Sequence, residues 1–84
     1  MPGQQDALAR THALGVLRSA SIGDRLVVRA RDGDGARDAL GTLTARSALR
    51  VTIDTRRGPV EVALADVLAA KPVPPPPAPR TPRP

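Results

Sequence analysis

The sequence predicts a mostly β protein, folded as a small and strongly bent antiparallel barrel of four or five strands. Apolar and polar residues alternate along several runs between residues 23 and 71, and this period of two is typical of strands with one buried face. Only short turns separate the runs, which favours hairpins. A chain of 84 residues is long enough for one small domain. Short strands can bury a core by curling, which also protects the sheet edges.

The aliphatic residues on the inward faces of these strands are expected to form the core. Its predicted members are Leu26, Val28, Leu40, Leu43, Leu49, Val51, Ile53, Val60, Val62, Leu64 and Val67. Each buried side chain contributes about 1.5 to 3 kcal/mol before the cost of ordering the chain. The net stability of so small a domain is therefore expected to be modest, and a helix or a partner chain would add to it.

The second strand, residues 39 to 46, has the least regular pattern. Leu40 and Leu43 lie an odd number of positions apart, so a regular strand would point them to opposite faces. A bulge at Gly41 is expected to restore their common direction.

A hairpin is expected between the two most regular strands, because a short turn at Thr55 to Pro59 separates them. The apolar residues stay on one face if Val51 faces Val62. Glu61 then lies opposite Thr52, whereas a slip of two residues would bring a like charge opposite it. The sequence therefore favours the register in which Val51 faces Val62.

Residues 1 to 22 form a leader for which one short helix is predicted, from Gln5 to Arg18. A narrow stripe at three-residue spacing supports it: Leu8, Thr11, Leu14 and Leu17. Gly15 costs about 1 kcal/mol relative to alanine within a helix. A frayed leader is the alternative interpretation.

Residues 72 to 84 hold most of the ten prolines and are expected to be a disordered tail or semi-rigid linker. Lys71, Pro74 and Pro77 match a basic-x-x-Pro-x-x-Pro ligand pattern, but the linker interpretation is preferred. The expected organisation is thus a leader, a barrel over residues 23 to 71, and this tail.

The composition excludes several classes of function. The chain has no cysteine, which excludes a disulfide scaffold and a thiolate metal site. It has no Phe, Tyr or Trp, so bases cannot stack on aromatic rings and no aromatic cage or groove can form. Arg10, His12 and Arg18 interrupt the start of the chain, which argues against a secretory signal. No run is long enough to span a membrane, and a cytoplasmic protein is expected.

No residue constellation suggests catalysis, a metal or a cofactor. Asp32-Gly33-Asp34-Gly35 resembles the start of a calcium loop, but Ala36 and Leu43 stand where further oxygen ligands are required. A surface loop is the preferred interpretation. His12 is the only imidazole, and no activated nucleophile can be identified. We therefore expect a non-enzyme.

Outward arginines are the best candidates for contacts with a partner or with phosphate. They are Arg25, Arg29, Arg31, Arg50, Arg56 and Arg57. Guanidinium groups can clamp carboxylates or phosphates. The alternative is that they pair with Asp24, Asp54 and Glu61 and only solvate the sheet. Residues 23 to 70 carry eight arginines and seven acids, unlike a dedicated DNA-binding domain with a strongly basic face.

Several stretches together resemble one known pattern. They are GDRLVVR at 23–29, DALGTL at 38–43, VTIDTRRGPVEV at 51–62, ADV at 65–67 and AKPVPP at 70–75. The pattern is similar to the small SH3-like barrel at the N-terminus of a group of actinobacterial GNAT-superfamily acetyltransferases, often described as histone acetyltransferases. Short free-standing actinobacterial proteins share it.

The resemblance implies an accessory, non-catalytic barrel. In those acetyltransferases the acetyl-CoA site belongs to a catalytic domain that follows the proline-rich stretch, so no activity carries over to any residue here. The leading expectation is an interaction module that binds a cytosolic protein, for example an acetyltransferase-like one. One alternative is a small barrel that contacts nucleic-acid phosphates without reading bases. Another is a piece of a longer acetyltransferase.

Overall fold

The computed structural model describes residues 3–74 as one helix and five strands. Helix α1 spans Gly3–Ser19 and precedes a sheet of β1 (Arg25–Asp32), β2 (Gly35–Arg46), β3 (Arg50–Thr55), β4 (Gly58–Ala63) and β5 (Val67–Pro72). A single turn of 3-10 helix, η1 (Leu64–Asp66), leads into β5. The prediction of a mostly β fold with an N-terminal helix is confirmed.

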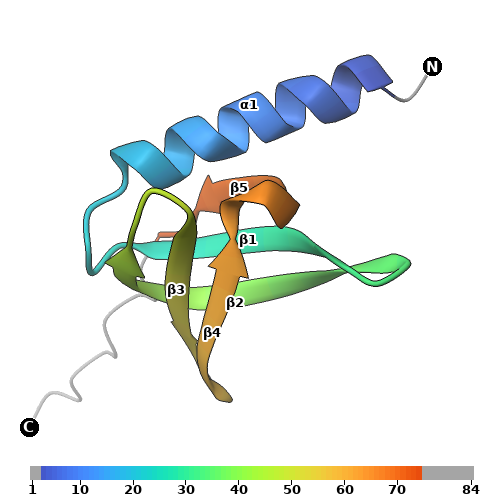
Figure 1. Cartoon of the computed structure of the whole chain (residues 1–84). Helices are drawn as coiled ribbons and strands as arrows, with labels where there is room; N and C mark the ends of the chain where they lie inside the picture. Colours follow the sequence, from blue (N-terminus) through green and yellow to red (C-terminus); the bar gives the residue numbers. More distant parts are fainter. Residues whose placement is uncertain (1–2, 75–84) are drawn as a thin grey trace, which may run out of the picture.

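The five strands form one antiparallel sheet in the order β4-β3-β2-β1-β5. The sheet is strongly bent, so that the β3–β4 hairpin crosses the direction of β1 and β2 (Figure 1). β2, the longest strand at 12 residues, pairs with β1 along its first part and with β3 along its second. This shared strand gives the sheet its small, barrel-like curl, because its two halves belong to differently directed hairpins.

Gly41 lies where β2 passes from its β1 partner to its β3 partner. It faces both Leu26 of β1 and Thr55 of β3. A Cβ built on Gly41 would lie 2.7 Å from the carbonyl carbon of Asp54 and 3.1 Å from Cα of Thr55. Only glycine permits this close approach of β3, as is common for glycine inside a bent strand.

The predicted register of the β3–β4 hairpin is confirmed. Val51 faces Val62, and Thr52 lies opposite Glu61. Aliphatic side chains thus share the inner face, as the alternation of the sequence requires.

Two predicted core residues are exposed, and the predicted bulge lies elsewhere. Leu40 is 46% exposed and Leu49 is 75% exposed. β2 pairs regularly with β1 through Gly41, so Ala39 and Gly41 take the inward positions and Leu40 points outward. The irregularity of β2 falls between Leu43 and Ala45, against β3. Leu49 lies in the turn before β3 rather than on an inward strand position.

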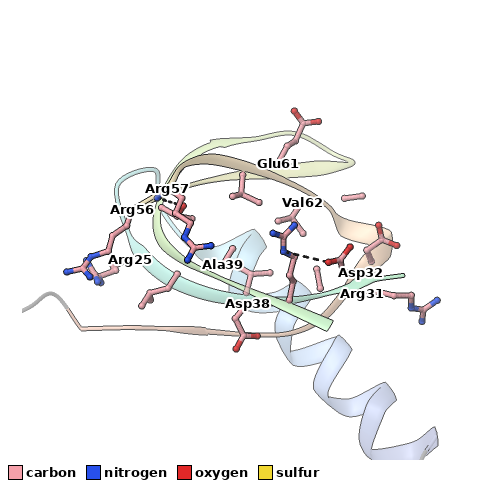
Figure 2. A pocket seen from close by; sticks show the side chains of 17 residues that line it. Arg25, Arg31, Asp32, Asp38, Ala39, Arg56, Arg57, Glu61 and Val62 are labelled. Atoms are coloured by element: carbon pink, nitrogen blue, oxygen red, sulfur yellow. Dashed lines mark hydrogen bonds and ion pairs between the residues drawn. The ribbon is translucent and has the colours of Figure 1, made fainter. Parts of the chain in front are cut away.

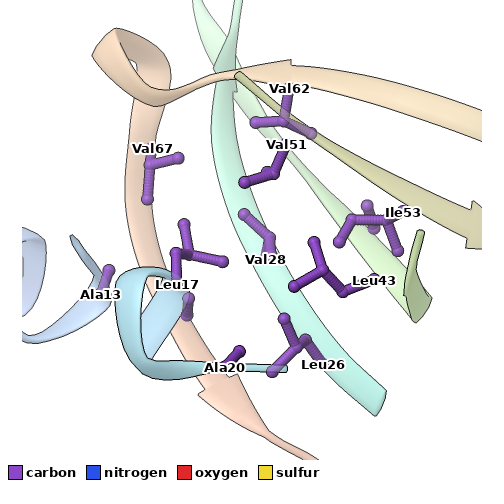
Figure 3. Packing of buried hydrophobic residues seen from close by; sticks show 12 residues of the cluster. Ala13, Leu17, Ala20, Leu26, Val28, Leu43, Val51, Ile53, Val62 and Val67 are labelled. Carbon is purple, nitrogen blue, oxygen red and sulfur yellow. The ribbon is translucent and has the colours of Figure 1, made fainter. Parts of the chain in front are cut away.

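The core combines the inner face of the sheet with the C-terminal half of α1 (Figure 3). Its fully buried larger side chains are Leu17, Leu26, Val28, Leu43, Val51, Ile53 and Val67. Ala13, Leu17 and Ala20 come from α1 and the segment directly after it. Leu8, which belongs to the predicted stripe, is 65% exposed. The helix prediction is confirmed, but the buried face is rotated from the predicted one toward Ala13.

Two arginines fasten α1 to the sheet through backbone carbonyls. Arg10 Nη1 donates to the carbonyls of Ala65, at 3.1 Å, and Val67, at 2.8 Å. Arg46 Nη1 donates to the carbonyls of Leu17, at 2.9 Å, and Ala20. The second arginine satisfies carbonyls that a helix leaves unpaired at its C-terminal end, and its charge complements the helix dipole there.

α1 is too short and too polar to cross a membrane, and no other helix that could do so occurs in the described part of the chain. The predicted proline-rich tail lies mostly outside the described residues, since only its first residues, as far as Pro74, are included.

Candidate interaction groove

The six arginines predicted as contacts lie on two parts of the sheet. Arg25, Arg29 and Arg31 alternate with the inward residues of β1 and so share its outer face. Arg50 begins β3, and Arg56 with Arg57 forms the turn between β3 and β4. The structure thus divides these residues between β1 and the β3–β4 hairpin and does not gather them in a single cluster.

Arg29 is engaged by a carboxylate on the neighbouring strand. It faces Asp38 of β2, and its Nε and Nη2 atoms donate to the two carboxylate oxygens at 2.9 and 3.3 Å. The hydrogen bond from Arg29 lowers the pKa of Asp38 below its usual value, and the same contact raises the pKa of Arg29. The pair is exposed and serves mainly to fix the two side chains on the sheet surface.

Arg50 is engaged in the same way, through an ion pair with Glu61 on β4. Of the three acids named as alternative partners, Glu61 pairs with one of the six arginines, whereas Arg29 pairs with Asp38 instead. The other four of the six candidate arginines make no ion pair within residues 7–74. They are Arg25, Arg31, Arg56 and Arg57.

An open groove of about 930 Å³ lies between β4 and the far part of the β1–β2 hairpin (Figure 2). Its floor is aliphatic: Ala30 and Val60 are partly accessible, and the core residues Val28, Ala39 and Val62 lie buried beside them. All four unpaired arginines line it. In Figure 2, Arg57 turns over the groove near Ala39, while Arg31 lies at the opposite end and its side chain extends away from the groove. The site therefore combines a hydrophobic floor with a basic rim.

The β3–β4 turn holds two of these arginines in a fixed backbone conformation. The hydroxyl of Thr55 donates to the carbonyl of Gly58 at 2.8 Å and accepts from the backbone N–H of Arg57 at 3.2 Å. Gly58 has a φ of 109°, a conformation that other residues rarely adopt. Because the backbone is bonded in this way, the Arg56 and Arg57 side chains extend from a defined turn.

Most of the acidic residues that line the groove form ion pairs with arginines of the same sheet. Asp32 pairs with Arg37 at 3.6 Å, Asp38 with Arg29, and Glu61 with Arg50. Asp66 is the remaining acidic residue of the lining, and it makes no ion pair among the described side chains. The lining thus contains four unpaired arginines and one unpaired carboxylate, and this excess of positive charge favours anionic groups.

Sequence reasoning missed Arg37 and the aliphatic floor of the groove. Arg37 faces Ala30 across the β1–β2 ladder, so it occupies an inward position beyond the end of the core. A tight turn at Gly33 and Asp34 fixes this register, since Asp32 faces Gly35. Recognising that turn in the sequence would have placed Arg37 beside the groove and Arg29 opposite Asp38.

The region first considered as a calcium loop is the tip of this hairpin. Asp32 is engaged by Arg37, and Gly33 has a φ of 59°. No group of three or more His, Asp or Glu residues suited to a metal ion occurs within the described residues.

Comparison with known proteins identifies no relative of this chain. No protein-family model matches it, and neither a curated protein nor a solved structure does.

Proposed function

We propose that this chain is a non-catalytic interaction module that binds an acidic, partly apolar segment of a cytosolic protein in the groove beside β4. One observation carries the proposal: the groove joins an aliphatic floor, with Ala30 and Val60 partly accessible, to four arginines without ion pairs among the described residues. Aliphatic surface favours burial of apolar side chains, and guanidinium groups favour carboxylates. A protein segment can supply both.

The class of partner is proposed from the resemblance to the barrels of actinobacterial acetyltransferases. An acetyltransferase-like catalytic domain, either a separate protein or a part of the same polypeptide, is the partner that the resemblance favours. The chain would then act by positioning that enzyme or its substrate protein. The chemistry of acetyl transfer would belong to the partner.

Nucleic acid is the less favoured ligand. A phosphate backbone would use the arginines but not the aliphatic floor, and Asp66 with the exposed carboxylate pairs would oppose it. The chain also lacks aromatic residues on which single-stranded bases stack. The distribution of charge therefore favours a protein segment over a polyanion of uniform charge.

Affinity capture with the tagged full chain tests the proposal. The double variant Arg56→Ala/Arg57→Ala removes two unpaired rim charges, and Arg18→Ala/Lys71→Ala removes the same charge away from the groove. We expect a protein to be retained by the wild type and the control variant but lost with the rim variant. Retention of nucleic acid alone, abolished by nuclease and by moderate salt, would support the phosphate-binding alternative instead.

A further inference from the structure

The two outermost strands of the sheet differ in how their free edges are covered. β5 packs extensively against α1 (Figure 1), and Arg10 occupies its Val67 carbonyl. β4 ends the sheet at the other side, and no described element other than β3 makes an extensive contact with it. One row of β4 backbone N–H and C=O groups therefore has no strand partner in the described part of the chain, and such a row is able to pair with another extended chain.

The uncovered edge of β4 runs along the groove. Val60 and Val62 of β4 belong to the groove floor, and Arg56 and Arg57 precede the strand at one end. An extended chain beside β4 would place every second side chain over the aliphatic floor. The intervening side chains would point to the face that carries Glu61, and the end of the segment beside the β3–β4 turn would lie near Arg56 and Arg57.

β4 also carries features that limit uncontrolled pairing. It has only six residues, and Pro59 near its start lacks a backbone N–H. Short length and proline are usual ways in which edge strands avoid aggregation. They leave room for one short segment, from Val60 to Ala63, and disfavour a long sheet-to-sheet contact.

We infer that an extended acidic segment of a protein partner binds as a sixth strand on the free edge of β4. The inference rests on the proposed function and names the way in which that partner binds. Charge complementarity with the four unpaired arginines selects an acidic segment. Backbone pairing selects a polypeptide, because nucleic acid cannot continue a β ladder.

A labelled octapeptide of alternating glutamate and valine, with blocked ends, tests the inference by fluorescence anisotropy. Two derivatives carry N-methyl groups, one on every glutamate nitrogen and the other on every valine nitrogen. Alternate N–H groups of a strand point to opposite sides, so only one derivative blocks pairing with β4. We expect that derivative to bind at least about tenfold more weakly, and the other to stay within about twofold of the parent peptide.

The charge requirement is tested with the same peptide. Arg56→Ala/Arg57→Ala is expected to weaken its binding by about tenfold, whereas Arg18→Ala/Lys71→Ala leaves it unchanged. An alternating lysine-valine octapeptide is expected not to bind. Far-ultraviolet circular dichroism of each variant verifies that it remains folded.

Two results would overturn strand addition while leaving the proposed function in place. In the first result, both methylated peptides bind as tightly as the parent peptide. In the second, both lose affinity to the same extent. Failure of the unmodified peptide to bind would also overturn the inference, and the capture experiment then decides the proposed function independently.

Discussion

Gly41 is the residue on which the bend of the sheet most directly depends. The position that a Cβ would occupy on Gly41 is taken by the backbone of Asp54 and Thr55 on β3. Strands β2 and β3 therefore approach each other more closely than a side chain at this position would allow. A backbone neighbour cannot move aside as a flexible side chain can. The effect of adding a single carbon at this position should therefore be large.

Gly41→Ala is expected to destabilise the protein by at least about 2 kcal/mol, because the added methyl group would force β3 away. Gly15→Ala serves as the control. It lies in α1 with no atom within 4 Å of the added carbon, and alanine should stabilise the helix there by about 0.5 to 1 kcal/mol. Urea unfolding followed by circular dichroism measures both. Equal stability of the Gly41→Ala variant and the wild type would contradict the close approach.

The Arg29–Asp38 pair predicts a small dependence of stability on acidic pH. Because Arg29 lowers the pKa of Asp38 in the folded state, its contribution is fully present above the ordinary aspartate pKa of about 3.9. It is lost as the pH falls through the lower folded-state pKa. Asp38→Asn should therefore lose stability less steeply than the wild type below about pH 4. Parallel curves for the two proteins would show that the pair contributes nothing.

The roles of single arginines could be predicted only in part from the sequence. The outward position of Arg25, Arg29 and Arg31 follows from alternation with aliphatic residues and is observed. Which of them is neutralised depends on the residue directly opposite, and so on the register set by the turn at Gly33 and Asp34. The sequence at Asp32 to Gly35 indicates only a surface loop, and this does not identify the partner of Arg29.

At the scale of elements, α1 is held by tertiary contacts rather than by its own sequence. It contains Gly15, and only its C-terminal half reaches the core. Arg46 of β2 binds its last carbonyls from across the molecule. Helical periodicity predicted the element, but the narrow stripe could not show which side faces the sheet, because small alanines provide much of the contact.

The helix contacts predict that two leucines of α1 differ sharply in how much they contribute to stability. Leu17 is 1% exposed and Leu8 is 65% exposed. Leu17→Ala should cost about 2 to 4 kcal/mol, since it leaves a cavity between α1 and the sheet. Leu8→Ala should change stability by less than about 0.5 kcal/mol. Thermal and urea unfolding of the two variants test this, and similar losses for both would contradict the observed face of the helix.

Strand β2 shows why large residues can mislead a sequence prediction. Leu40 is predicted to point inward because it is large and apolar. In the structure, its neighbours Ala39 and Gly41 occupy the inward positions and Leu40 points outward. The crowded bend leaves room there only for small residues. The β3–β4 hairpin was predicted correctly because aliphatic and polar residues alternate from Arg50 to Asp54 and because Val60 and Val62 flank Glu61.

At the scale of the whole molecule, the groove exists because the sheet bends without pairing its two outer strands. β4 and β5 remain at opposite ends of the strand order, and α1 packs against β5 (Figure 1). The aliphatic floor is thus continuous with the core, and Ala30 and Val60 leave part of their surface accessible beside β4. Sequence patterning predicted the bent sheet, but the groove depends on how far each hairpin extends past the bend, which no local pattern encodes.

Backbone chemical-shift mapping tests most directly whether this groove is the binding surface. The isotope-labelled protein would be titrated with the glutamate-valine octapeptide in a proton-nitrogen correlation experiment. The account predicts that the largest changes occur at Arg56 and Arg57, along Val60 to Ala63, and at Ala30 and Arg37 across the groove. Changes confined to α1 or to the outer face around Val27 and Lys71 would contradict it.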